Sequence, residues 1–104
     1  MLTVPIETQI LFAGILFLLG LIGLLVRRNL IFMLMSIEIM LNSAGLVFII
    51  AGTHWKNPDG QVMFIFILAV AAVEVAIGLA LILQVYHHFK TLDADAVNKL
   101  KDGN

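Results

Sequence analysis

Residues 62–86 read VMFIFILAVAAVEVAIGLALILQVY, a stretch of 25 residues with one charged side chain, Glu74. An α-helix needs about 20 apolar residues to cross the hydrocarbon core of a bilayer, so this stretch is long enough to span it. Two further apolar stretches, residues 6–26 and 30–52, meet the same requirement. Because lipid offers the backbone no hydrogen-bond partner and three segments are too few to close a barrel, all three are predicted to be helices.

The composition of the whole chain agrees with this prediction. Of its 104 residues, 62% are hydrophobic and 12% are charged, whereas soluble domains are nearer half apolar and a quarter charged. A soluble monomer of this size would expose large apolar patches, which excludes a soluble enzyme, and the composition also excludes a disordered chain. The net charge of -1 excludes nucleic acid as the partner, and the absence of cysteine excludes thiolate metal sites and cysteine nucleophiles. No metal site is predicted.

The predicted fold is therefore all-α and integral to the membrane. We expect a single membrane domain over residues 1–104, with a polar tail at the end of the chain. Its parts are three transmembrane helices at about residues 6–26, 30–52 and 61–86, and the tail at residues 87–104.

The connections between these helices predict how the helices are arranged. The first connection is only residues 27–29 (Arg-Arg-Asn), so the first two helices should be antiparallel neighbours, and Asn29 is suited to cap the second helix. The second connection, within residues 53–61, contains Pro-Asp-Gly, which favours a turn. Helix three is expected to start at Asp59 or Gly60.

Lysine and arginine are divided unevenly between the two ends of the predicted spans. One end carries five of them and the other end carries only Lys56. Because basic residues accumulate in cytoplasmic loops, we expect the first loop and the C-terminus in the cytoplasm and the N-terminus outside. The five residues are Arg27, Arg28, Lys90, Lys99 and Lys101.

Two carboxylic acids lie deep inside the predicted spans, Glu38 in the second and Glu74 in the third. At a rise of about 1.5 Å per residue, both lie near the middle of a hydrocarbon core about 30 Å thick, with Glu38 one turn nearer the cytoplasm. An acidic side chain at that depth costs roughly 2.5 to 3.5 kcal/mol, on values for Asp, so its retention suggests a use. Desolvation disfavours the charged form of a carboxyl group and eases proton exchange near neutral pH. Glu38 and Glu74 are the candidate catalytic residues, as a proton relay.

Three residues are expected to support this pair. Asn42 lies one turn after Glu38 on the same helix face, where it can hydrogen-bond the carboxylate or hold a bridging water. Arg27 and Arg28 are expected to anchor the orientation, with a partner's loop or lipid phosphate as alternative contacts. Because no cation lies within the spans and three helices cannot enclose an aqueous path, the chain is expected to be one subunit of an obligate hetero-oligomer in the lipid bilayer.

Two stretches resemble the NuoK subunit family of the proton-pumping NADH:quinone oxidoreductase, respiratory complex I. They are RRNLIFMLMSIEIMLNSAGLVF (residues 27–48) and DGQVMFIFILAVAAVEVAIGLALILQ (residues 59–84). The specific elements are the RRNL loop, the IEIM that follows it, the DGQVM at the start of helix three and the AAVE later in that helix. They occur in this order, and the resemblance covers the whole membrane part of the chain.

The resemblance implies a three-helix subunit of a bacterial cytoplasmic (inner) membrane, multi-pass, between the quinone-proximal part of the membrane arm and the antiporter-like subunits. It implies that Glu38 and Glu74 are links in a hydrated chain of charged side chains. It also places Arg27 and Arg28 in a loop to which the family's function is sensitive. FMN, iron-sulfur clusters and quinone would belong to other subunits, with no cofactor in this chain.

Other classes of protein remain as alternatives. The nearest is the small subunit of a multisubunit cation/proton antiporter, which also has three helices and a buried acid. A small multidrug transporter would show four helices with a glutamate in the first, and a hole-forming protein would not need two central carboxylates. A structural scaffold would keep both acids permanently protonated.

Overall fold

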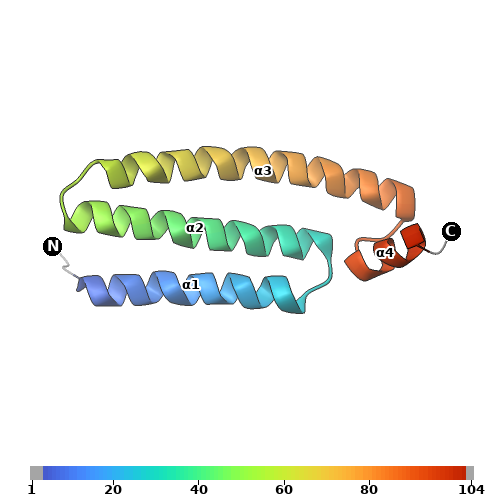
Figure 1. The fold of residues 1–104 in the computed structure, drawn as a ribbon, viewed down its shortest axis with the longest axis horizontal. Helices are drawn as coiled ribbons and strands as arrows, with labels where there is room; N and C mark the ends of the chain where they lie inside the picture. The colour runs from blue at the N-terminus through green and yellow to red at the C-terminus, as the bar shows by residue number, and fades with distance from the viewer. Residues whose placement is uncertain (1–3, 103–104) are drawn as a thin grey trace.

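The computed structural model describes residues 4–102, and over that range the chain is all-helical (Figure 1). Residues 1–3 and 103–104 of the predicted domain lie outside the described residues. The helices are α1 (Ile6–Val26), α2 (Leu30–His54), α3 (Asp59–Phe89) and α4 (Ala94–Asp102). The first three are long and apolar enough to cross a membrane, which confirms the predicted fold class.

The helix bounds follow the prediction closely for α1 and less closely afterwards. Helix α1 has the predicted bounds, α2 continues two residues further to His54, and α3 starts at Asp59 and continues to Phe89. With 31 residues, α3 is about 46 Å long, which exceeds a hydrocarbon core of about 30 Å. The apolar run ends before the helix does, because backbone hydrogen bonds continue through polar residues. The predicted polar tail therefore contains the last turn of α3 and the short helix α4.

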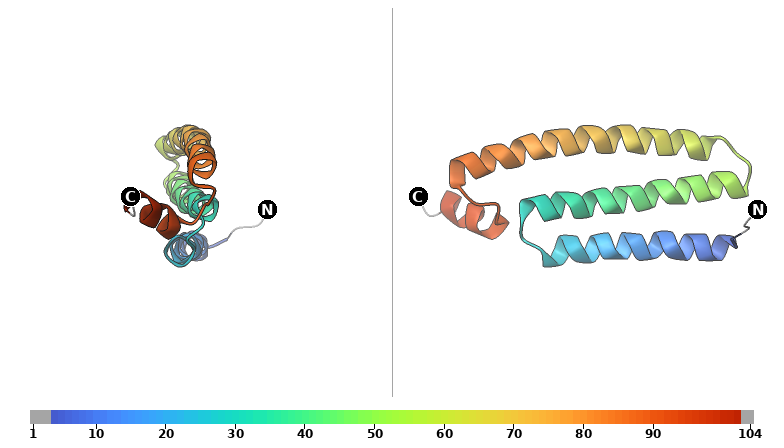
Figure 2. Two further views of the ribbon diagram at one scale, coloured as in Figure 1. Left: turned by 90° about the vertical axis from the view of Figure 1, so that its right-hand side faces the viewer. Right: turned by 180° about the vertical axis from the view of Figure 1, so that it is seen from behind.

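Helix α2 is the middle of a single layer of three antiparallel helices. It packs against α1 on one side and α3 on the other, as the front and end-on views show (Figures 1 and 2). Only 6% of the most apolar window of α3 is buried within the chain, against 22% for α2. Most of the apolar surface of α3 therefore faces lipid or another protein.

Small residues allow the helices of this layer to approach closely. A Cβ atom built on Gly20 of α1 would lie 2.9 Å from the backbone oxygen of Ser36 in α2. A Cβ atom built on Gly60 of α3 would lie 2.8 Å from the Cα of Gly52 in α2. The backbones meet at these two points without intervening side chains, as is common between membrane helices.

Asn29 caps the N-terminus of α2, as predicted from its position. Its side-chain Oδ1 accepts hydrogen bonds from the backbone N–H groups of Ile31 (2.9 Å) and Phe32 (3.4 Å). The N–H of Leu30, one position earlier, donates instead to the carbonyl oxygen of Leu92 at 2.9 Å. The first three amides of α2 are thus all satisfied.

Asn29→Ala is expected to destabilise the start of α2 by about 1 kcal/mol, the usual cost of losing a helix cap. The thermal unfolding midpoint of the purified protein in detergent should fall. Asn29→Asp keeps the accepting oxygen and should restore most of the loss. An Asn29→Ala protein with an unchanged midpoint would show that the cap contributes nothing here.

Candidate functional site

Three close contacts fix the register of α2 against α3. They pair Leu34 with Gly78, Gly45 with Phe64 and Ile67, and Gly52 with Gly60. Each step forward along α2 is matched by an equal step back along α3. Because Glu38 follows Leu34 by four residues and Glu74 precedes Gly78 by four, the two acids lie level with each other.

This level placement corrects the expectation that Glu38 lies one turn nearer the cytoplasm. The depth estimate assumed that α3 ends level with the start of α2. By the observed register Ile82 lies level with Leu30, and α3 continues from there to Phe89, past the start of α2 (Figure 1). Because the last turns of α3 extend past the start of α2, Glu74 lies less deep in the layer than its distance from the end of α3 suggested.

Glu38 and Glu74 differ in burial although they lie level. Glu38 is half-buried, and its Oε1 is buried without a hydrogen-bond partner among residues 4–102. Glu74 is exposed on the outside of the layer. Two negative charges so placed repel each other, and the repulsion disappears when either group takes up a proton.

Asn42 is not brought to the buried oxygen of Glu38. Its side chain is exposed, and Oε1 of Glu38 receives no hydrogen bond from it. A buried polar atom without a partner is costly, especially in an apolar surrounding. The carboxyl group of Glu38 therefore depends on a proton, or on a group from outside the described residues, to satisfy this oxygen.

The two arginines of the first loop make different contacts. The guanidinium of Arg27 lies 4.1 Å from the centroid of the Phe32 ring, a cation–π contact. The Nε of Arg28 lies 3.2 Å from Oδ2 of Asp95 on α4. Glu38 follows the start of α2 by eight residues, or about 12 Å along the helix, so the loop is separate from the acids.

The sequence did not point to Asp95 as a contact of the first loop. A signal was present: Asp93 precedes an amphipathic run and can cap a helix. In the structure Oδ1 of Asp93 accepts hydrogen bonds from the N–H groups of Asp95 (2.9 Å) and Ala96 (3.1 Å). The start of α4 could thus be found from sequence, but its contact with the loop could not.

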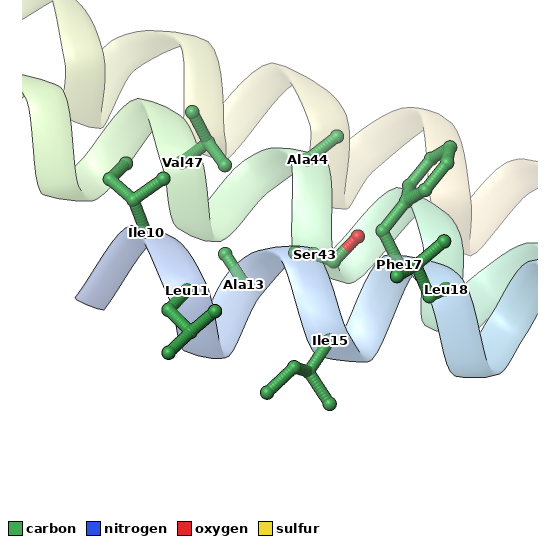
Figure 3. Close-up of a pocket in the computed structure, with 10 residues that line it drawn as sticks. Ile10, Leu11, Ala13, Ile15, Phe17, Leu18, Ser43, Ala44 and Val47 are labelled. Atoms are coloured by element: carbon green, nitrogen blue, oxygen red, sulfur yellow. The ribbon is translucent and has the colours of Figure 1, made fainter. Parts of the chain in front are cut away.

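A pocket of about 650 Å³ lies between α1 and α2 (Figure 3), and neither acid lines it. Its lining is apolar apart from Ser43, whose hydroxyl donates to the carbonyl oxygen of Met40 at 2.7 Å. No lining side chain titrates, so the pocket offers packing surface and no acid–base chemistry. Within residues 4–102 no group of three or more His, Asp and Glu side chains is placed to hold a metal ion.

Comparison with known proteins identifies the family. Residues 8–102 match the family described as NADH-ubiquinone/plastoquinone oxidoreductase chain 4L. The NADH-quinone oxidoreductase subunit K of Nitrosospira multiformis is 64% identical over 101 residues, covering 97% of this chain and 99% of the relative. The subunit K of Acidiphilium cryptum is 59% identical over 97% of this chain and 99% of the relative. That of Chromohalobacter salexigens is 58% identical over 94% and 96%.

These matches extend over nearly the full length of both partners and confirm the resemblance found in the sequence. They decide against the small antiporter subunit, since the family and the relatives carry the name of an oxidoreductase. The three apolar helices agree with a multi-pass protein of the bacterial inner membrane. The chain belongs to the NADH-ubiquinone/plastoquinone oxidoreductase chain 4L family and is a membrane-arm subunit of NADH-quinone oxidoreductase, complex I.

Proposed function

We propose that Glu38 and Glu74 are proton-relay residues on the proton-translocation pathway that complex I couples to quinone reduction. The observation that carries this proposal is the buried Oε1 of Glu38, which has no hydrogen-bond partner among residues 4–102. A second acid, Glu74, lies level with it on the neighbouring helix. An acid held in this way in the middle of a membrane span is a functional-site candidate by default.

The pair can serve a proton relay because a carboxyl group takes up and releases a proton, and two like charges on neighbouring helices disfavour each other. When one of two neighbouring acids carries its proton, ionisation of the other meets no repulsion from it. A change in hydration or in the field from a neighbouring subunit would then move the proton from one state of the pair to another. The chain itself carries out no electron transfer in this account.

We propose that the chain lies between antiporter-like and quinone-proximal subunits in an obligate hetero-oligomer. The exposed Glu74 and the outward apolar surface of α3 support contacts with other proteins on that side. FMN, iron-sulfur clusters and quinone would be held by those other subunits, with no cofactor in this chain. Asn42, exposed one turn after Glu38, would present its amide to a neighbouring subunit or to water in the pathway.

The proposed orientation has the N-terminus outside and the first loop and C-terminus in the cytoplasm. The first loop and α4 lie at the same end of the layer, because the N–H of Leu30 donates to Leu92 and that of Ala94 donates to Arg28. Five of the six Lys and Arg residues therefore gather at one end. Cytoplasmic ends carry such an excess, and Arg27 and Arg28 would anchor it.

Glu74→Asp tests the proposal at the exposed acid. Aspartate keeps a titratable carboxyl group but is one methylene shorter. The rate of proton pumping should therefore fall by less than about tenfold, because a positioned proton-transfer group contributes about 10²-fold or more and aspartate keeps part of that contribution. Glu74→Gln, which cannot titrate, should fall further. Proton uptake driven by NADH in membrane vesicles measures both. Equal pumping by the two variants, at the wild-type rate, would remove Glu74 from the pathway.

A further inference from the structure

The C-terminal segment returns to the first loop and binds it through the backbone. Helix α3 ends at Phe89, and the left-handed conformation of the next residue, Lys90 (φ 60°), turns the chain back. The N–H of Leu30 then donates to the carbonyl of Leu92 at 2.9 Å, and the N–H of Ala94 donates to the carbonyl of Arg28 at 3.0 Å. We call residues 91–95, which make this contact, the clasp. Figure 2 shows α4 beside the loop that joins α1 to α2.

The clasp supplies a hydrogen bond that the loop itself does not provide. The side chain of Asn29 satisfies the second and third amides of α2, and the first amide, that of Leu30, bonds only to the clasp carbonyl of Leu92 in these contacts. Asn29 also forms an isolated antiparallel bridge with Asp93. The clasp is thus part of the cap of α2, although it lies some sixty residues later in the sequence.

Asp95 adds an ion pair to this backbone contact. Its Oδ2 lies 3.2 Å from Nε of Arg28, with the two side chains 62% and 72% exposed. Asp93 holds the start of α4 because its Oδ1 accepts hydrogen bonds from the N–H groups of Asp95 and Ala96, so Asp95 is fixed relative to the backbone bridge. Arg27, the neighbouring arginine, lies over Phe32 and takes no part in this contact.

We propose that Asp95 is a positioning residue, which acts through Arg28 to hold the clasp closed over the first loop. The closed clasp joins the end of α3 to the start of α2. At the opposite end of these helices the contact between Gly52 and Gly60 joins the end of α2 to the start of α3. The register that keeps Glu38 level with Glu74 is therefore fixed from both ends, and this consequence rests on the proposed function of the two acids.

The test begins with Asp95→Arg in the assembled complex, which places two positive charges side by side. Hydrogen exchange at Ala94, followed by mass spectrometry of peptides from the tail, reports how often the clasp opens. Exchange should be faster by up to about fivefold, the upper end of the range expected when an exposed ion pair is lost. Raising the ionic strength should reduce the difference from wild type, because salt screens exposed charges.

A charge exchange separates positioning from a general loss of structure. The double variant Arg28→Asp/Asp95→Arg restores an opposite pair and should return both the exchange of Ala94 and the NADH:quinone turnover toward wild type. Lys101→Glu, at an exposed site of the same helix, reverses a charge without touching Arg28 and should change neither measurement. Turnover is normalised to the flavin content of the assembled complex.

Faster exchange with reduced turnover in Asp95→Arg, both reversed by the charge exchange, supports the proposal. Unchanged exchange at Ala94 overturns it, because Asp95 would then not hold the clasp. Faster exchange with wild-type turnover also overturns it, because the clasp would then position nothing that the reaction needs. Failure of the proton-relay proposal is seen separately, as wild-type pumping by Glu38→Gln, and leaves the exchange measurement unaffected.

Discussion

Glu38→Gln is expected to remove most of the proton pumping of complex I while the complex still assembles. Glutamine has the shape of glutamate, so the packing of α2 against α3 should be kept. It cannot take up or release a proton, and a positioned proton-transfer group contributes about 10²-fold or more to the step it serves. We expect NADH-driven proton uptake in membrane vesicles to fall by roughly tenfold or more, since this step limits only part of the cycle.

Glu7→Gln is the matched control for this prediction. Glu7 is exposed in the first turn of α1, at the end of its span. Its substitution by glutamine is the same chemical change as Glu38→Gln, made outside the central region of the spans. Its pumping should equal that of wild type. Wild-type pumping in an assembled complex that carries Glu38→Gln would show that the half-buried acid takes no part in the pathway.

Gly60→Ala is expected to have the second large effect, on assembly. A Cβ atom at this position would meet the backbone oxygen of Phe48 and lie 2.8 Å from the Cα of Gly52. These are backbone atoms, which cannot rotate away as a flexible side chain can. Helices α2 and α3 would have to separate, at a cost of about 1–3 kcal/mol for overpacking. The amount of assembled complex in native gels and its thermal midpoint should both fall.

Gly14→Ala is the control for that prediction. A Cβ atom on Gly14 meets nothing within 4 Å inside the chain, so no contact of the layer is disturbed. Alanine also favours the helix over glycine by about 1 kcal/mol. Normal assembly of Gly60→Ala, with an unchanged thermal midpoint, would contradict the close approach of α2 and α3 at this point.

The apolar runs and the short first loop predicted much of the fold correctly. The bounds of α1 and the cap at Asn29 followed from local rules, because the end of an apolar run and a capping side chain act within a few residues. The length of α3 did not follow, since the helix continues beyond the apolar run through His87 and His88 to Phe89. The level of Glu38 against Glu74 depends on that length, so the sequence placed the two acids one turn apart.

The clasp could not be predicted for a different reason. Its hydrogen bonds join backbone atoms of Leu30 and Leu92, and of Arg28 and Ala94, which are far apart in sequence. Backbone N–H and C=O groups are the same in nearly every residue, so the amino-acid sequence does not indicate which of them will bond to each other. The ion pair of Arg28 with Asp95 depends on that fold, and the sequence alone treated Arg27 and Arg28 as equivalent.

Infrared difference spectroscopy of the assembled complex tests the central claim most directly. The carbonyl stretch of a protonated carboxyl group disappears when the group ionises, so the spectrum follows each acid during NADH-driven turnover. We expect carboxyl bands that change with turnover in wild type and that are lost in Glu38→Gln and Glu74→Gln. Bands of both acids that remain constant through the whole cycle would show that the two side chains serve only as structure.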